Sequence, residues 1–199
     1  KIVLPTMQEI PAKFVYFINA HTGQVINIID SLVYYDVSGT VTGMEWEDPF
    51  TNGVQLQRSF AHNYVSLDTQ NGETGVNGFY QFAGLSGPHT LTSYLEGPWV
   101  AVSNAQLPRS DYAAQITSDT NETTHDWNWD ADDISYLDEE SNAFYHVNRI
   151  HDYVASVGVT EMDLQMMVTV NMNQYCNAYW SYPPHSINFY QAGNGCEST

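Results

Sequence analysis

Hydrophobic and polar positions follow two different periods along this chain, and the longer period predicts a helix. Between residues 139 and 157 apolar side chains recur at steps of three and four, which places them in one stripe on an α-helix. The stripe consists of Ala143, Val147, Ile150, Val154 and Val157. Asp138 stands at the N-cap position, and Gly158 is placed to end the helix. We therefore expect one helix from Glu139 to Val157.

A strand is expected directly after this helix. The segment from Leu164 to Met172 is too apolar for an exposed sheet edge, so we expect it inside a sheet. At the other end of the chain, two β-branched and aromatic runs between Phe14 and Ile29 flank a turn with Gly23. Glycine supplies the positive φ that such turns require, so the pattern predicts a β-hairpin. An isolated hairpin is marginally stable, and we expect it to pair or pack with something else.

The middle of the chain has the shorter period, in which apolar and polar residues alternate. Five short alternating segments lie between turn dipeptides such as Asn71-Gly and Gly87-Pro, which is typical of an antiparallel sandwich. These segments are Tyr35 to Thr42, Asn63 to Leu67, Gly78 to Phe82, His89 to Leu95 and Trp99 to Ser103. The predicted fold class is α+β and mostly β. Residues 1–36 form the N-terminal strand and hairpin, residues 37–104 the β-sandwich, and residues 105–199 a small α+β half-domain.

The last third of the chain resembles the first half of a thermolysin- or fungalysin-like zinc metallopeptidase domain. Five phrases carry the resemblance: Ser141 to Tyr153, Val170-Asn171, Cys176 to Trp180, Ile187 to Tyr190 and Gly193 to Cys196. In that family the next element is a helix with His-Glu-x-x-His, whose histidines bind zinc and whose glutamate is the general base. This sequence ends at Thr199, before such a helix. The resemblance implies that this chain contains no catalytic residue, no cofactor and no zinc ligand. Zinc is expected to bind only where the missing helix is present.

The same resemblance assigns a role to Asn177, Ala178, Tyr179 and Trp180. In the family, the Asn-Ala-aromatic-Trp segment is the edge along which the peptide substrate lies. An extended edge of this kind binds a peptide as an added strand. The alternative is that Asn177 closes a turn and Trp180 belongs to the core. Two shorter similarities accompany this one. The hairpin phrase resembles the end of a PepSY-type propeptide, and residues 37–104 resemble a carboxypeptidase-regulatory-like β-sandwich.

Charge restricts the partners. The chain has 5 basic and 23 acidic residues, a net charge of −18, which would repel nucleic acid and anionic lipid. No apolar run is long enough to span a membrane. The chain begins at Lys1 without a leader-like segment, and a signal or pro-segment could have been removed already. We therefore expect a secreted, extracellular protein.

Three further features bear on this expectation. Cys176 and Cys196 lie within the family-like region, and a disulfide between them would suit an oxidising compartment; two free thiols are the alternative. Asn121 begins a weak glycosylation sequon. Four carboxylates in the acidic loop are weak candidates for calcium ligands. The loop lacks the EF-hand pattern, and we favour the alternative of a solvated loop anchored by two tryptophans. The candidates are Asp126, Asp130, Asp132 and Asp133.

Polar residues crowd the predicted helix without forming a metal motif. His146 and His151 are five residues apart and point away from each other, whereas paired zinc ligands on a helix are four apart. We expect His146, Arg149, His151 and Asp152 to have structural roles.

Two functional hypotheses follow. The first is a non-catalytic N-terminal portion of a secreted metallopeptidase that supplies the peptide-binding edge. The second is an extracellular structural or filament subunit that assembles through its N-terminal strand. In both, the partner is another polypeptide: the catalytic half in the first, and further copies of the chain in the second.

Overall fold

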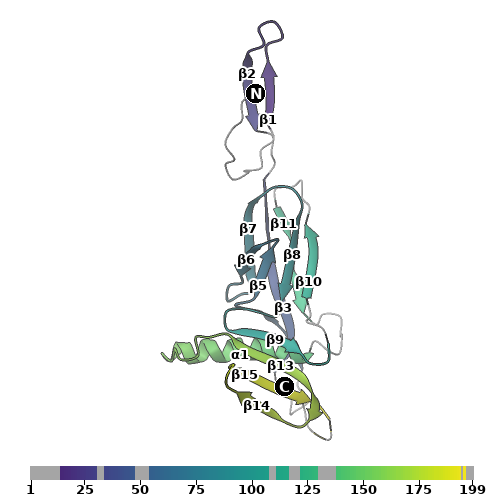
Figure 1. The fold of residues 1–199 in the computed structure, drawn as a ribbon, viewed down its shortest axis with the longest axis vertical. Helices are drawn as coiled ribbons and strands as arrows, with labels where there is room; N and C mark the ends of the chain where they lie inside the picture. Colours follow the sequence, from purple (N-terminus) through teal and green to yellow (C-terminus); the bar gives the residue numbers. More distant parts are fainter. Residues whose placement is uncertain are drawn as a thin grey trace.

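The computed structural model describes residues 14–30, 34–47, 54–107, 111–116, 122–129, 138–193 and 195. The molecule is elongated, with the N-terminal hairpin at one end, the sandwich sheets in the middle, and the helix and the C-terminal sheet at the other end (Figure 1). This is the predicted α+β, mostly-β fold. None of the described helices is long and apolar enough to cross a membrane.

The predicted N-terminal hairpin is confirmed. Strand β1 (Phe14–Ile18) pairs antiparallel with β2 (Val25–Asp30). The turn is closed by Asn19, whose side-chain oxygen accepts hydrogen bonds from the backbone N–H groups of His21 and Thr22 at 2.9 and 3.2 Å. Gly23 has a φ of 70°, as the turn requires.

A long strand, β3 (Tyr35–Trp46), organises the sandwich. It pairs antiparallel with β4 (Gln55–Ser59) and β7 (Phe79–Leu85), and parallel with β11 (Glu122–Thr124) and β12 (Trp127–Trp129). A second sheet has the order β10 (Asp111–Ile116), β8 (His89–Tyr94), β5 (Tyr64–Leu67) and β6 (Gln70–Glu73). Buried positions alternate along β3, as the sequence pattern predicts for a strand with one face in the core.

The C-terminal sheet has the order β14 (Ala178–Ser181), β15 (Ser186–Gln191), β13 (Met166–Tyr175) and β9 (Val100–Asn104). The predicted interior strand is β13, which lies between β15 and β9 and pairs parallel with both. The predicted boundary at residue 104 is not a boundary between sheets. Strand β9, which precedes it, belongs to the C-terminal sheet, whereas β10, β11 and β12, which follow it, pair with strands of the sandwich. One continuous core joins both parts and includes Val41, Phe60, Phe144 and Val168.

The helix α1 (Asp138–Ser156) begins and ends within one residue of the predicted limits. Gly158 ends the helix with a φ of 85°. Its N–H donates to the Ala155 carbonyl at 2.9 Å, and the Val159 N–H donates to the Val154 carbonyl at 3.2 Å. These two hydrogen bonds form a Schellman cap. The buried face differs from the predicted stripe. Ile150 is 59% exposed, whereas Phe144, Asn148 and His151 are buried.

The difference arises from where α1 sits. The helix contacts β3, β9 and β13, so it packs against the end of the sandwich as well as the C-terminal sheet. The sandwich end presents polar backbone, and Asn142 accepts a hydrogen bond from the Trp46 N–H at 2.9 Å. The predicted stripe instead lines a small apolar hollow against the C-terminal sheet: Val147, Ile150 and Val154 face it together with Met162, Leu164 and Ile187.

Candidate functional site

The predicted peptide edge lies on the outermost strand of the C-terminal sheet. Asn177 directly precedes β14, and its carbonyl accepts a hydrogen bond from Tyr190 N–H at 2.9 Å. Ala178 and Tyr179 are both exposed on β14, which pairs only with β15 among the described strands. Trp180 is 58% exposed and therefore is not a core residue.

An exposed aromatic group extends this edge. The Trp180 and Tyr182 rings lie nearly parallel, with an angle of 6° and centroids 6.2 Å apart, and the His185 ring is 4.6 Å from Tyr182. Tyr182 is 65% exposed. Rings with open faces in this arrangement offer an apolar surface beside an open strand edge.

The remaining predicted site residues are separated. Asp126 accepts hydrogen bonds from the N–H and hydroxyl of Thr40 at 2.7 and 2.9 Å, so this carboxylate is engaged with β3. The tryptophans on either side of Asn128 are buried, as expected for anchors. Asn121, Asp130, Asp132, Asp133 and Cys196 lie outside the described residues. Within the described ranges no group of three or more His, Cys, Asp or Glu side chains could hold a metal ion.

The pairing of the two cysteines stays a prediction. Cys176 is not a free thiol, and its sulfur lies 3.1 Å from the Gly193 carbonyl oxygen. The position of Cys196 is not described.

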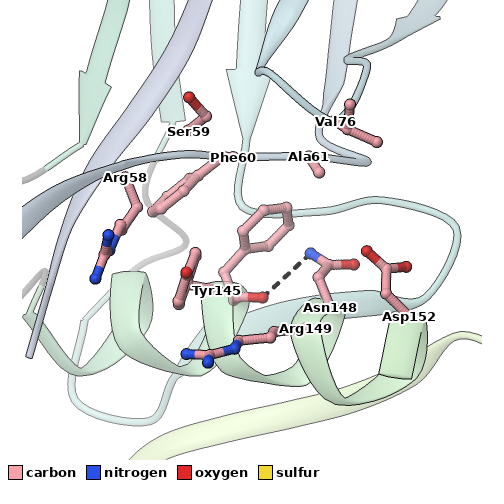
Figure 2. Close-up of a pocket in the computed structure, with 10 residues that line it drawn as sticks. Arg58, Ser59, Phe60, Ala61, Val76, Tyr145, Asn148, Arg149 and Asp152 are labelled. Carbon is pink, nitrogen blue, oxygen red and sulfur yellow. Dashed lines mark hydrogen bonds between the residues drawn. The ribbon is translucent and has the colours of Figure 1, made fainter. Parts of the chain in front are cut away.

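A cleft of about 320 Å³ lies between the sandwich and α1 (Figure 2). One wall is the segment from β4 into the following loop together with Val76, and the other is one face of α1. The residues that line it are Arg58, Ser59, Phe60, Ala61, Val76, Phe144, Tyr145, Asn148, Arg149 and Asp152. Four of the helix residues, 145, 148, 149 and 152, are spaced so that they share a face.

Two of the five basic residues of the chain line this cleft. Arg58 Nε lies 2.8 Å from a carboxylate oxygen of Glu45, which is 1% exposed, and a terminal guanidinium nitrogen lies 3.6 Å from Glu47. The hydrogen bond to Glu45 raises the pKa of Arg58, so the guanidinium stays charged. Arg149 is exposed and makes no ion pair with any described residue. His146 lies on the same helix, with Nε2 3.5 Å from Glu45.

Asp152 lies at the centre of a chain of carboxylates and imidazoles, here called the Asp152 relay. It consists of Glu73, His62, Asp152, His151 and Asp163, which contact one another in that order at 2.8, 3.2, 3.4 and 3.1 Å. Trp99 stacks on the His151 ring at 3.9 Å and 11°. The relay connects β6 and a sandwich loop to α1 and the loop after it, which is a structural role of the kind expected for His151 and Asp152.

Asn148 has one satisfied and one unsatisfied side-chain atom. Its amide nitrogen donates to the Phe144 carbonyl at 3.1 Å, which fixes the orientation of the amide. Its Oδ1 atom is buried and has no hydrogen-bond partner among the described residues. A buried amide oxygen without a donor is costly, and in a cleft this atom can accept a hydrogen bond from water or from a bound molecule.

Sequence reasoning missed this cleft. The helix face at 145, 148, 149 and 152 was visible as a polar stripe beside the apolar one. Nothing in the sequence placed Arg58 or His62 opposite it, because these residues are about 90 positions away and match no motif.

The comparisons with known proteins assign no family. No model of a known protein family matches the sequence, and no match was found among the curated proteins. One similar solved structure is a DUF3823 family protein from Parabacteroides merdae ATCC 43184, with 13% identity and a TM-score of 0.30. The match covers 49% of this chain and 46% of that chain. A likeness this weak supports no conclusion about fold or function.

The predicted relationship to zinc metallopeptidases is therefore wrong. Neither the family models nor the curated proteins connect the chain to thermolysin- or fungalysin-like enzymes, to PepSY propeptides or to carboxypeptidase-regulatory-like domains. Four of the five phrases behind the resemblance are combinations of only two to five residues, and Asn occurs in all five. Such combinations suit turns and strands in general and do not identify ancestry.

Proposed function

We propose that this chain is a non-catalytic assembly subunit that associates with further copies of itself through the hairpin β1-β2. The single observation that carries the proposal is the exposure of apolar side chains along both strands of the hairpin. Nine of them are between 44% and 68% exposed: Phe14, Val15, Tyr16, Phe17, Ile18, Val25, Ile26, Ile28 and Ile29.

Both faces of the hairpin are apolar. Because side chains alternate along a strand, Phe14 and Tyr16 lie on one face and Val15 and Phe17 on the other. Among the described strands, β1 and β2 pair only with each other, so each has an open edge. A two-stranded sheet is marginal in water by itself, and exposed apolar surface of this extent indicates a protein interface.

The charge distribution favours a second copy as the partner. Residues 14–29 contain no Asp, Glu, Lys or Arg, whereas the whole chain has a net charge of −18. Two copies can therefore bring their hairpins together without placing like charges in the contact. The hairpin also lies at the tip of the elongated molecule, away from the acidic body (Figure 1).

A matched pair of substitutions tests the proposal. Ile26 on the hairpin and Val54 before β4 are both 68% exposed, so Ile26→Lys and Val54→Lys change equally exposed apolar residues. In light scattering at micromolar concentration, we expect the unchanged chain and Val54→Lys to be larger than the 22.4 kDa monomer, and Ile26→Lys to be a monomer. Burying charge without a partner is unfavourable, and a specific contact should exceed about 1,000 Å². A stable monomer of the unchanged chain would refute the proposal.

A second candidate function is recognition of an extended peptide at β14. The observation that favours it is the combination of an outermost strand with the exposed Trp180 and Tyr182 rings. A strand edge supplies main-chain hydrogen bonds, and neighbouring aromatic side chains supply apolar contact. The added strand can come from the hairpin of a neighbouring copy.

We place this assembly outside the cell. The proposal is supported by the acidic composition and by the cysteine pair, which would be oxidised in an extracellular compartment.

A further inference from the structure

We propose that the cleft between the sandwich and α1 binds a short peptide with free termini. Arg149 and Arg58 would hold the carboxylate, and Asn148 and Asp152 would hold the ammonium group. This site is separate from the hairpin and does not depend on assembly. The proposal joins three features of the cleft: cations at one end, acceptors at the other, and apolar residues on the wall that the sandwich forms.

The cationic end is formed by two guanidinium groups. In Figure 2 the guanidinium groups of Arg58 and Arg149 lie on the same side of the cleft, near Tyr145. Arg58 uses Nε for Glu45 and has one terminal nitrogen 3.6 Å from Glu47, which leaves the other terminal nitrogen able to donate, and Arg149 has no ion pair among the described residues. Guanidinium groups bind carboxylates with directed, charge-assisted hydrogen bonds. Because the chain has so few basic side chains, an anionic group would bind preferentially at this end of the cleft, where two of them lie.

The other end offers hydrogen-bond acceptors. Asn148 is 4% exposed, and its Oδ1 atom lacks a donor among the described residues. Figure 2 shows this amide beside Asp152 on the opposite side of the cleft from the arginines. Asp152 Oδ1 contacts His62 at 3.2 Å, and a carboxylate has further lone pairs available. An ammonium group has three donors and a positive charge, so it suits both acceptors together.

The size of the cleft fits a small peptide. The helix face that lines the cleft runs from Tyr145 to Asp152, a rise of about 10 Å, and an extended chain spans about 3.3–3.6 Å per residue, so a peptide of two or three residues fits along the cleft. A volume of about 320 Å³ is at the lower end of ordinary ligand cavities. Phe60, Ala61 and Val76 also line the cleft, on the wall that the sandwich forms, and would contact an apolar side chain. A simple anion would leave the Asn148 oxygen without a donor.

Calorimetric titration with glycyl-leucine tests the proposal. Two blocked peptides serve as probes of the two ends: glycyl-leucinamide has no carboxylate, and N-acetyl-glycyl-leucine has no ammonium group. We expect glycyl-leucine to bind, and each blocked peptide to bind about ten- to a hundredfold more weakly, since each loses charge-assisted hydrogen bonds. Absence of binding at millimolar glycyl-leucine, or equal binding of acetate alone, would overturn the proposal.

Variants assign the two ends. Arg149→Gln should weaken glycyl-leucine binding by about tenfold or more. It should leave glycyl-leucinamide binding unchanged, because glycyl-leucinamide has no carboxylate for the guanidinium to bind. Arg149→Lys keeps the charge and should lose less, while Lys13→Gln removes the same charge from another part of the chain and should lose nothing. Unchanged glycyl-leucine affinity in folded Arg149→Gln contradicts the site. The same titration on Ile26→Lys separates this result from the state of assembly.

Discussion

At the scale of single residues, the seam between the sandwich and α1 holds an unusual concentration of buried polar groups. Glu45, Asn142, Asn148 and His151 are all less than 10% exposed. Glu45 is paired with Arg58, and His151 contacts Asp152 and Asp163, so most of this polarity is compensated. Several buried side-chain atoms have no hydrogen-bond partner among the described residues, Glu45 Oε2 and Asn148 Oδ1 among them, and Asn148 is the one on the helix face that lines the cleft, where a ligand could supply the donor.

A close backbone approach gives a prediction at this scale. A Cβ atom added to Gly39 on β3 would lie 1.9 Å from the His125 carbonyl oxygen, an impossible contact with backbone. Gly39→Ala should therefore push β3 away from residues 122–127 and lower the free energy of unfolding by about 1–3 kcal/mol. Urea denaturation measures the change.

The matched control is Gly75→Ala. A Cβ atom there would have its nearest neighbour at 3.4 Å, in ordinary contact, and Gly75 has no positive φ. We expect a change within about 0.5 kcal/mol. Equal loss of stability in the two variants would show that the packing of Gly39 is not the cause.

At the scale of elements, α1 shows that local signals fix the limits of a helix but not its orientation. The acidic first turn and the Gly158 cap define its ends. The face that it buries is chosen by the two surfaces that it contacts. Phe144 therefore packs on Phe60, with ring centroids 5.2 Å apart, while Ile150 remains largely exposed.

This orientation gives a second prediction. Phe144→Ala should lower the free energy of unfolding by about 3–5 kcal/mol, because a fully buried aromatic side chain leaves a cavity. Ile150→Ala, on the predicted apolar stripe, should cost much less, about 1 kcal/mol or below. Thermal or urea unfolding of both variants decides the matter. A larger loss for Ile150→Ala would mean that the helix is oriented as its apolar stripe suggests.

At the scale of the whole molecule, the two exposed apolar surfaces lie at opposite ends. The hairpin is at one end and the β14 edge with Trp180 at the other (Figure 1). A contact between different surfaces of identical chains does not close on itself unless the rotation forms a ring, and it otherwise extends into a filament. A self-complementary contact, in which two hairpins use the same surface, would instead close as a dimer.

Mixing two variants distinguishes these arrangements. If the hairpin of one copy adds to β14 of the next, Ile26→Lys and Trp180→Asp should each be monomeric alone and form one-to-one dimers when mixed, because each retains one intact surface. Analytical ultracentrifugation measures the stoichiometry. If Trp180→Asp alone still assembles like the unchanged chain, β14 is not the receiving surface, and hairpin-to-hairpin contact accounts for the assembly.

The sequence alone determined the features that depend on neighbouring residues. Alternation along Tyr35 to Thr42, the Gly23 turn and the Gly158 cap each act within a few positions, so the hairpin, most sandwich strands and the helix limits could be predicted. The short strands β4, β6, β11 and β12 were not predicted, because their segments alternate weakly and pairing with other strands defines them.

Only the tertiary structure decided which distant segments meet. It placed β9 beside β13, turned Phe144 rather than Ile150 into the core, and brought Arg58 and Arg149 into the same cleft. Each of these outcomes depends on packing between segments that are tens of residues apart, and no local pattern encodes the choice among the available surfaces. The cleft exists only because the sandwich and the helix pack in this way.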